Sequence, residues 1–214
     1  MKKMDDPSSY SVPSGPGTAE YEEKRSRFIG YLQPAEDEEA ARAFIASIKK
    51  KHYDARHNCW CYSLKDGPER YSDDGEPQGT AGIPMLETLR REEITNVVCV
   101  VTRYFGGILL GTGGLVRAYT KAAKGALENA GVSVMRKWTE CGINCPYSLF
   151  ERIKIEIASF SGVITDTEYG TDILITASIP SEDHAAFSGR IRDITSGSLE
   201  PVILNESYRP VSIR

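Results

Sequence analysis

The chain has 214 residues, of which 40% are hydrophobic and 26% are charged. These proportions are ordinary for globular proteins and exclude disordered and fibrous classes. The longest aliphatic run, about five residues around Val97–Val101, is much shorter than the ~20 residues that a membrane-spanning helix needs. Residues 1–7 carry charges without an apolar stretch behind them, so we expect no secretory signal and a cytoplasmic location.

The charge is unevenly distributed along the chain. There are 26 Lys and Arg residues against 30 Asp and Glu residues, which gives a net charge of −4. Residues 137–214 hold 7 basic and 11 acidic residues, which leaves 19 of each sign in residues 1–136. A protein that coats nucleic acid through its overall field is basic. Any phosphate-bearing partner must therefore be met by a local patch.

Five cysteines in a chain without an export signal predict reduced thiols. Cys59 and Cys61 share one face of a predicted strand, and with Cys141 and Cys145 they supply four thiols, enough for a zinc site. The spacings between these cysteines differ from the usual CxxC pattern, and their neighbours are apolar. We therefore expect buried cysteines, and we expect neither a metal site nor another cofactor.

The first two-thirds of the chain mixes strands and helices. Residues 1–18 are rich in Ser, Pro and Gly and predict a flexible tail. Residues 36–51 have apolar side chains at helical spacing, an acidic first turn and a basic last turn, which predicts a helix. The other predicted elements are a strand or hairpin over Glu20–Leu32, a strand over His57–Leu64, a polar loop over Lys65–Thr80, a short helix from about Ile83, a strand buried on both faces over Asn96–Tyr104, and a helix that follows the glycines of Phe105–Gly114 and ends at Ala130.

The last third has the order strand, helix, hairpin, helix, strand, which is typical of a ferredoxin-like βαββαβ domain. These elements are Val134–Pro146, Tyr147–Phe160, Val163–Tyr169 with Asp172–Ile179, a helix from Ser181 to Gly197, and Leu199–Asn205. The sequence thus predicts an α+β protein with a tail over residues 1–18, an N-terminal domain over 19–137 and a C-terminal domain over 138–214.

The glycine-rich segment after the buried strand almost matches two phosphate-binding motifs. Gly106 and Gly111 have the spacing of a Walker loop, but Thr112 stands where that loop needs lysine. Gly111 and Gly113 begin a dinucleotide fingerprint, but Val116 stands where its last glycine belongs. We therefore exclude nucleotide hydrolysis and dinucleotide binding.

Anion binding without catalysis stays open for this segment, because backbone N–H groups at a helix start attract anions. In the helix that follows, basic residues at i, i+4 and i+7 form a stripe on one face. The alternative is that the glycines allow a tight turn and that the stripe is a solvated face. The candidate anion- or nucleic-acid-binding residues are Arg103, Gly106, Gly107, Gly111, Thr112, Gly113, Arg117, Lys121 and Lys124.

A second polar segment carries three carboxylates within four positions. Paired carboxylates can bind a metal or transfer protons, and His57 lies in the preceding strand. The dipeptides Asp-Gly and Glu-Pro are also ordinary turn formers, so we expect the aspartates to cap the turn and orient backbone amides, and we predict no catalytic residue. The residues singled out in this loop are Asp73, Asp74, Gly75, Glu76, Gly79 and Thr80.

Taken together, these segments resemble a known family. Two segments of the chain resemble the hallmark of the YigZ/IMPACT family. The first is Tyr71–Pro77 with Gly79–Leu86, and the second is Arg103–Val116. The family's early strands are similar to Lys24–Ile29 and Asp54–Cys59, and the match runs from about Glu20 to Gly131. The C-terminal third is similar to the smaller domain of bacterial members.

The resemblance implies an N-terminal fold shared with the second domain of a small-subunit ribosomal protein and with domain IV of elongation factor G. It also implies a C-terminal domain like the ferredoxin-like domains of elongation factor G. Eukaryotic relatives act in translational control by binding a protein that activates a kinase of initiation. This sequence does not contain their extra N-terminal recognition domain, so we do not expect that partner here.

From this resemblance we expect a non-enzymatic, cytoplasmic binding protein linked to translation regulation. Its expected partner is RNA, the ribosome or a translation-related protein; we expect neither a membrane partner nor DNA sequence specificity. One alternative is a small hydrolase or metal-dependent enzyme that uses Asp73, Asp74, Glu76 and His57. Another is a protein–protein adaptor that docks through the acidic C-terminal domain.

Overall fold

The computed structural model describes residues 9–212. Their contacts divide the chain into two compact units, Tyr10–Val134 together with residues 211–212, and Met135–Pro210. The division falls inside one long strand, β7 (Val132–Cys145), and the expected domain boundary after residue 137 lies in the same strand. Each unit has its own buried hydrophobic cluster.

The segment expected to be a flexible tail is structured where it is described. Residues 1–8 lie outside the described residues, but β1 (Tyr10–Pro13) is a strand that pairs with β7. Ser11 also bridges to Ile94, and its carbonyl accepts the Thr95 N–H at 3.0 Å. The prediction of a tail is therefore wrong from Tyr10 onward, because this segment finds its hydrogen-bond partners far away in the sequence.

The N-terminal unit is built on a five-stranded sheet in the order β2-β3-β6-β4-β5, with every neighbouring pair antiparallel. The strands are β2 (Gly17–Glu23), β3 (Ser26–Pro34), β4 (His57–Ser63), β5 (Glu69–Ser72) and β6 (Val97–Tyr104). The hairpin predicted over residues 20–32 is thus formed by β2 and β3. The short edge strand β5 was expected to be loop, because its four polar residues carry no period-two pattern.

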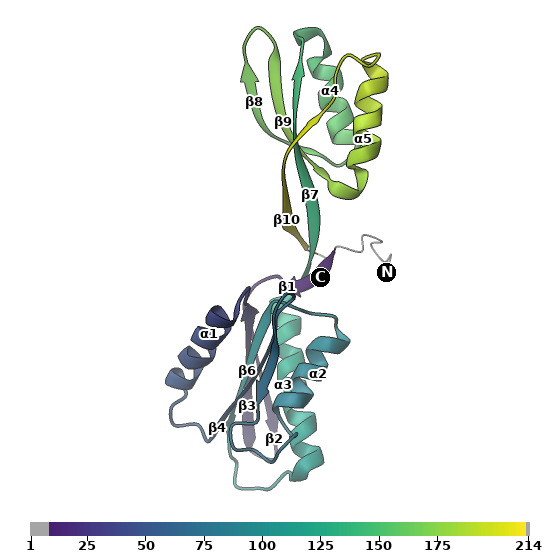
Figure 1. Cartoon of the computed structure of the whole chain (residues 1–214). Coiled ribbons are helices and arrows are strands. Elements are labelled where there is room, and N and C mark those ends of the chain that lie inside the picture. The colour runs from purple at the N-terminus through teal and green to yellow at the C-terminus, as the bar shows by residue number, and fades with distance from the viewer. Residues whose placement is uncertain (1–8, 213–214) are drawn as a thin grey trace. The chain divides into compact units, whose positions relative to one another are not determined.

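Helices cover both faces of this sheet (Figure 1). One face packs against α1 (Glu38–Lys51), and the other packs against α2 (Gly82–Arg91) and α3 (Gly111–Ala130). Along β6, alternate side chains enter the two cores. Its burial on both faces explains the continuous apolar sequence and confirms that prediction.

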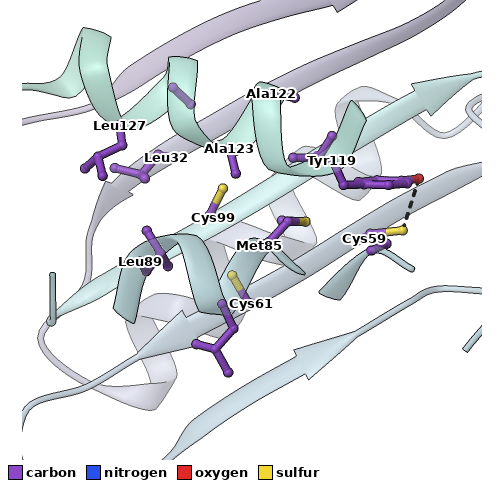
Figure 2. Close-up of a cluster of buried hydrophobic side chains, with 14 of the residues drawn as sticks. Leu32, Cys59, Cys61, Met85, Leu89, Cys99, Tyr119, Ala122, Ala123 and Leu127 are labelled. Carbon is purple, nitrogen blue, oxygen red and sulfur yellow. Dashed lines mark hydrogen bonds between the residues drawn. The ribbon is translucent and has the colours of Figure 1, made fainter. Parts of the chain in front are cut away.

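The core under α2 and α3 is closely packed. Figure 2 shows Tyr119, Ala122 and Leu127 of α3 above Met85 of α2 and the buried cysteines of the sheet. A Cβ atom at Gly30 on β3 would lie 2.4 Å from the Ala122 carbonyl oxygen. Small residues on both elements therefore bring the α3 backbone directly onto the sheet.

The C-terminal unit has the predicted ferredoxin-like order. The elements after β7 are α4 (Tyr147–Ser159), β8 (Val163–Tyr169), β9 (Ile173–Pro180), α5 (Ser181–Ile194) and β10 (Val202–Ser212). The strands lie in the order β10-β7-β9-β8, and β9 is antiparallel to both of its neighbours. Helices α4 and α5 pack on one face of this sheet (Figure 1), where aliphatic side chains and Phe187 form the core. The predicted α+β class is confirmed.

Candidate functional site

The two motif segments of the sequence meet in the N-terminal unit. They line a pocket of about 430 Å³, together with the end of β6 and the start of α3. We call this cavity the motif pocket. Its wall includes Arg56, His57, Glu76, Arg103, Gly111 and Thr112.

A buried ion pair lies at the base of the motif pocket. Arg103 on β6 stands opposite His57 on β4 in the sheet register, and Glu76 reaches both from the loop after β5. The Arg103 Nη1 atom donates to Glu76 Oε1 at 2.6 Å, and the Tyr119 hydroxyl donates to the same oxygen at 2.8 Å. Only 7% of the Arg103 side chain and 3% of the Glu76 side chain are exposed. Such a pair needs hydrogen bonds to offset its desolvation, and two of them meet at Glu76 Oε1.

The sequence predicted that Arg103 joins an exposed basic patch. That prediction is wrong, because Arg103 is buried in the ion pair with Glu76. Its guanidinium lies 5.5 Å from the ring centroids of both Phe28 and Phe105, so aromatic faces hold it in addition to Glu76. Its Nε atom is buried and has no hydrogen-bond partner in the described structure. A buried donor without a partner is uncommon in native proteins, and here it belongs to a residue that lines the pocket.

Asp73 organises the backbone at the start of α2. Its Oδ1 atom accepts the N–H groups of Ala81 and Gly82 at 3.0 and 2.8 Å, and its Oδ2 atom accepts the Gly79 N–H at 2.8 Å. The Thr80 hydroxyl donates to the Pro77 carbonyl at 2.6 Å. The carboxylate thus caps the otherwise free amides of a helix N-terminus, which is the structural role expected from the sequence.

Asp74 fixes the orientation of His57. Its carboxylate accepts from Lys49 Nζ and from the Asn58 N–H, each at 2.7 Å, and its carbonyl accepts from His57 Nδ1 at 2.8 Å. Because a carbonyl only accepts, the proton of a neutral His57 lies on Nδ1. The His57 Nε2 atom is then left with its lone pair, 4.0 Å from Glu76 Oε2.

The carboxylates of this loop are thus bound to backbone amides, Lys49 and Arg103. Within residues 9–212, no group of three or more His, Cys, Asp or Glu side chains is placed to hold a metal ion. His57 and Glu76 also line the motif pocket, but their Nε2 and Oε2 atoms are 4.0 Å apart, which is longer than a hydrogen bond.

The start of α3 forms the other wall of the motif pocket. Its first turn has no acidic residue and no side-chain cap, and Gly111, Thr112 and Gly113 are exposed. The guanidinium of Arg117 folds back over this turn, with Nη1 3.6 Å from the place where a Cβ atom of Gly113 would lie. Free amides, the positive end of a 20-residue helix and a cation thus come together.

The basic stripe lies on the exposed face of α3, as its spacing predicted. Leu115, Ala118, Ala122 and Ala126 form the opposite, buried face. Lys121 contacts Tyr21, with 3.3 Å between Nζ and the phenol oxygen, and Lys124 lies 4.0 Å from Glu128. Arg117 makes no ion pair with a described residue, so it is the stripe residue most free to meet a phosphate.

The glycines before α3 have different roles. A Cβ atom at Gly106 would lie 2.1 Å from the carbonyl carbon of Arg25, and the Gly106 N–H donates to Ser26 Oγ at 3.1 Å. Gly106 thus permits close approach to the β2–β3 turn, as the structural alternative proposed. Gly107 and Gly111 have φ values of +83° and +70° with open space around them, so backbone conformation explains these two.

All five cysteines are buried, as predicted. Cys59 Sγ donates to the Asp73 carbonyl at 3.0 Å and lies 3.3 Å from the Tyr119 hydroxyl, a contact drawn in Figure 2. Burial raises the pKa of the Cys59 thiol strongly and that of Cys141 to about 11. These thiols therefore stay protonated at neutral pH and are poor nucleophiles.

Three residues of the site were not identified from the sequence. Tyr119 falls on the buried helix face four residues after Leu115, and a buried tyrosine usually needs a partner for its hydroxyl, so its spacing was a usable signal. Arg56 and Phe105 lie beside β4 and β6. No local pattern marks them, because only the tertiary fold brings them to the pocket.

Both parts of the chain match known families. Residues 24–127 match the Impact N-terminal domain, and residues 143–198 match a domain of unknown function, DUF1949. The chain is 38% identical over 202 residues to the IMPACT family member YigZ of Escherichia coli strain K12, which covers 92% of this chain and 99% of that protein. The chain belongs to the IMPACT family. The resemblance seen in the sequence is confirmed, and the motif pocket lies within the Impact N-terminal domain.

Other relatives extend this result. The IMPACT family member YvyE of Bacillus subtilis is 35% identical over 191 residues, which is 88% of each chain. A protein IMPACT homolog of Dictyostelium discoideum is 39% identical over 95 residues, only 42% of this chain and 27% of that protein. A crystal structure described as that of a hypothetical protein is 37% identical, covers 92% of this chain and 98% of its own, and superposes with a TM-score of 0.58.

No helix within residues 9–212 combines the length and the apolar character needed to cross a membrane.

Proposed function

We propose that this protein is a non-enzymatic binding protein that contacts RNA, free or in the ribosome, through phosphate groups at the start of α3. The observation that carries the proposal is the uncapped, exposed first turn of α3 beside Arg117. A helix N-terminus binds phosphate through its free N–H groups and its dipole. The proposed link to translation rests on the family resemblance alone.

Two further features support an anionic ligand at this end of the sheet. Arg56 and Arg103 line the adjacent motif pocket, and the buried Arg103 Nε atom has no hydrogen-bond partner among residues 9–212. Because residues 1–136 have no net charge, attraction to RNA has to come from this local cluster and should depend on salt.

The test is the binding of a labelled single-stranded RNA, followed by fluorescence anisotropy over a series of salt concentrations. We expect Arg117→Glu with Lys121→Glu to weaken binding to all sequences, and to reduce the slope of log K against log salt by about 0.7 for each phosphate that the protein no longer neutralises. The matched control is Arg91→Glu with Arg152→Glu, which changes the net charge equally at two exposed arginines outside the site. Equal weakening by the control pair, or an absence of salt-dependent binding by the unchanged protein, would overturn the proposal; the latter result favours the adaptor alternative.

A second candidate function, hydrolysis, is favoured by one observation. His57 presents its Nε2 atom to the motif pocket beside Glu76, while the Asp74 carbonyl holds its other ring nitrogen. This is the arrangement of an oriented general base. Hydrolysis of a peptide, ester or phosphate substrate that is lost in His57→Gln at unchanged melting temperature would establish this function; an inactive unchanged protein would remove it.

A further inference from the structure

A second open cavity lies on the α1 side of the sheet, away from the motif pocket. It encloses about 440 Å³ between α1 and the strands β4 and β5. We call it the Trp60 groove. It is lined by Arg42, Ile45, Lys49, Trp60, Tyr62 and Arg70, along with one alanine.

An aromatic surface forms the floor of the Trp60 groove. Trp60 and Tyr62 alternate on one face of β4, and their rings are nearly parallel, with an angle of 6° and centroids 5.8 Å apart. Tyr62 is fully buried, and its hydroxyl donates to Glu38 Oε1 at 2.9 Å. Tyr62 is therefore rigid and limits the movement of the indole ring, while Trp60 itself remains partly exposed.

Three cations surround this aromatic surface, and no acidic residue lines the groove. Arg42 pairs with Glu38 one helical turn away, and Lys49 pairs with Asp74 at 2.7 Å. Such partly exposed pairs are weak and can exchange a carboxylate for a phosphate. Arg70 is exposed, its closest described hydrogen-bond partner is the Glu69 carbonyl at 3.4 Å, and it makes no close ion pair with a described residue, although the Glu38 carboxylate is near enough to interact with its charge.

We propose that the Trp60 groove binds a base of single-stranded nucleic acid. The base stacks on the indole of Trp60, and Arg42, Lys49 and Arg70 contact the phosphates on either side of it. A planar aromatic surface among three cations fits a base with flanking phosphates better than it fits an apolar peptide, which offers these cations no anion. The inference rests on the proposed RNA binding and adds a contact made by different residues on the other face of the sheet.

The groove and the motif pocket are close enough to act on one strand of nucleic acid. Trp60 follows His57 by three residues on β4, a distance of about 10 Å along the strand. Asp74 contacts both places, because its carboxylate holds Lys49 and its carbonyl holds His57. A single strand of several nucleotides that rounds this end of the sheet, from one face to the other, would therefore meet both sites.

The test uses tryptophan fluorescence, since the chain has only two tryptophans. Trp138→Phe leaves Trp60 as the sole reporter and removes a buried indole N–H for which the described part of the chain offers no hydrogen-bond partner. On titration of this full-length variant with a single-stranded oligouridine, we expect quenching of Trp60 fluorescence that saturates at the midpoint found by anisotropy.

Further substitutions separate stacking from folding. Trp60→Ala should weaken binding by about 5- to 150-fold, the range for the loss of one stacked base, and Trp60→Phe should retain most of the affinity. The exposed Arg70→Ala should weaken binding and flatten the salt dependence at unchanged melting temperature. Arg91→Ala, at an exposed arginine outside the groove, should do neither.

The outcomes distinguish this inference from the proposed function. One outcome is that anisotropy detects binding while Trp60 fluorescence does not change, and that Trp60→Ala and Arg70→Ala bind as tightly as the unchanged chain. This outcome would overturn the proposed base-binding role of the Trp60 groove and leave the α3 site standing. Quenching that persists undiminished in Arg117→Glu with Lys121→Glu would support the groove and count against the α3 site. If neither measurement detects binding to oligouridine, both proposals are overturned.

Discussion

The two units of this protein bury different kinds of polar groups. The N-terminal unit encloses a charged pair, Glu76 with Arg103, under the motif pocket. The buried polar side chains of the C-terminal unit are the hydroxyl groups of Thr139, Ser178 and Thr195, set in an aliphatic core. Burying charges is costly, and such groups gather at functional sites more often than in plain cores. The comparison is consistent with our proposal that the binding chemistry lies in the N-terminal unit.

The largest effect is expected from breaking the buried pair. Glu76→Ala leaves the Arg103 guanidinium buried without its carboxylate and should cost about 3–5 kcal/mol of unfolding free energy. Denaturant unfolding followed by circular dichroism measures this. Glu69→Ala is the control, because it breaks the half-exposed pair with Arg90 and should cost about 1 kcal/mol or less. Equal costs for the two variants would contradict the structural role of the Glu76–Arg103 pair.

The stability of the C-terminal unit should depend on the volume of its apolar core side chains, since the described residues of its core include no charged pair. Ile153→Ala removes a fully buried side chain from the core of this unit and should cost about 2–5 kcal/mol. Below the unfolding transition, RNA affinity should stay unchanged, because the proposed contacts lie in the N-terminal unit. A parallel loss of affinity in the folded variant would place part of the binding surface in the C-terminal unit.

A smaller effect separates two neighbouring glycines. In Gly106→Ala the new methyl group would overlap the Arg25 backbone, so we expect a loss of about 1–3 kcal/mol. In Gly107→Ala the methyl group enters open space, and the cost is limited to about 1 kcal/mol for the positive φ. Melting temperatures give the order directly, and a larger loss in Gly107→Ala would show that close approach to the β2–β3 turn does not control this loop.

The smallest effect concerns pH. Burial lowers the pKa of His52, which hydrogen-bonds to the hydroxyls of Tyr31 and Tyr104. The unfolded chain then binds the proton more readily than the folded chain, so stability should decrease as pH falls below about 6.5 toward the lower folded value. In thermal melts, His52→Gln should reduce the dependence of melting temperature on pH between pH 7.5 and 5.5. An unchanged dependence would show that other groups cause it. His184 in the C-terminal unit, whose pKa is also lowered by burial, should contribute in the same direction.

Local pattern predicted those elements whose signals are local. The helix expected over residues 36–51 is α1, and Asp37 caps it by accepting the Ala40 N–H at 2.7 Å. The basic stripe of α3 follows from spacing alone. By contrast, β1 escaped prediction because its partner β7 lies far away in the sequence, and β5 escaped prediction because its residues carry no period-two pattern.

The environment of Arg103 could not be predicted for the same reason. Its charge is balanced by Glu76, which lies 27 residues away in the sequence and reaches it only through the folded loop. The aromatic surface of the Trp60 groove likewise depends on α1 and β5 lying beside β4. Residue types and spacing therefore located the motif segments, and tertiary structure decided which of their side chains line the motif pocket.

The most direct test of the central claim, that nucleic acid binds the N-terminal unit at the start of α3, is a titration of the isotope-labelled full chain with single-stranded oligouridine, followed by amide NMR. We predict that the largest chemical-shift changes occur at Gly111, Thr112 and Gly113, with smaller changes at Arg117 and little change over residues 143–198. Shifts centred on residues 143–198, or saturating binding that leaves the three amides of α3 unmoved, would contradict the account.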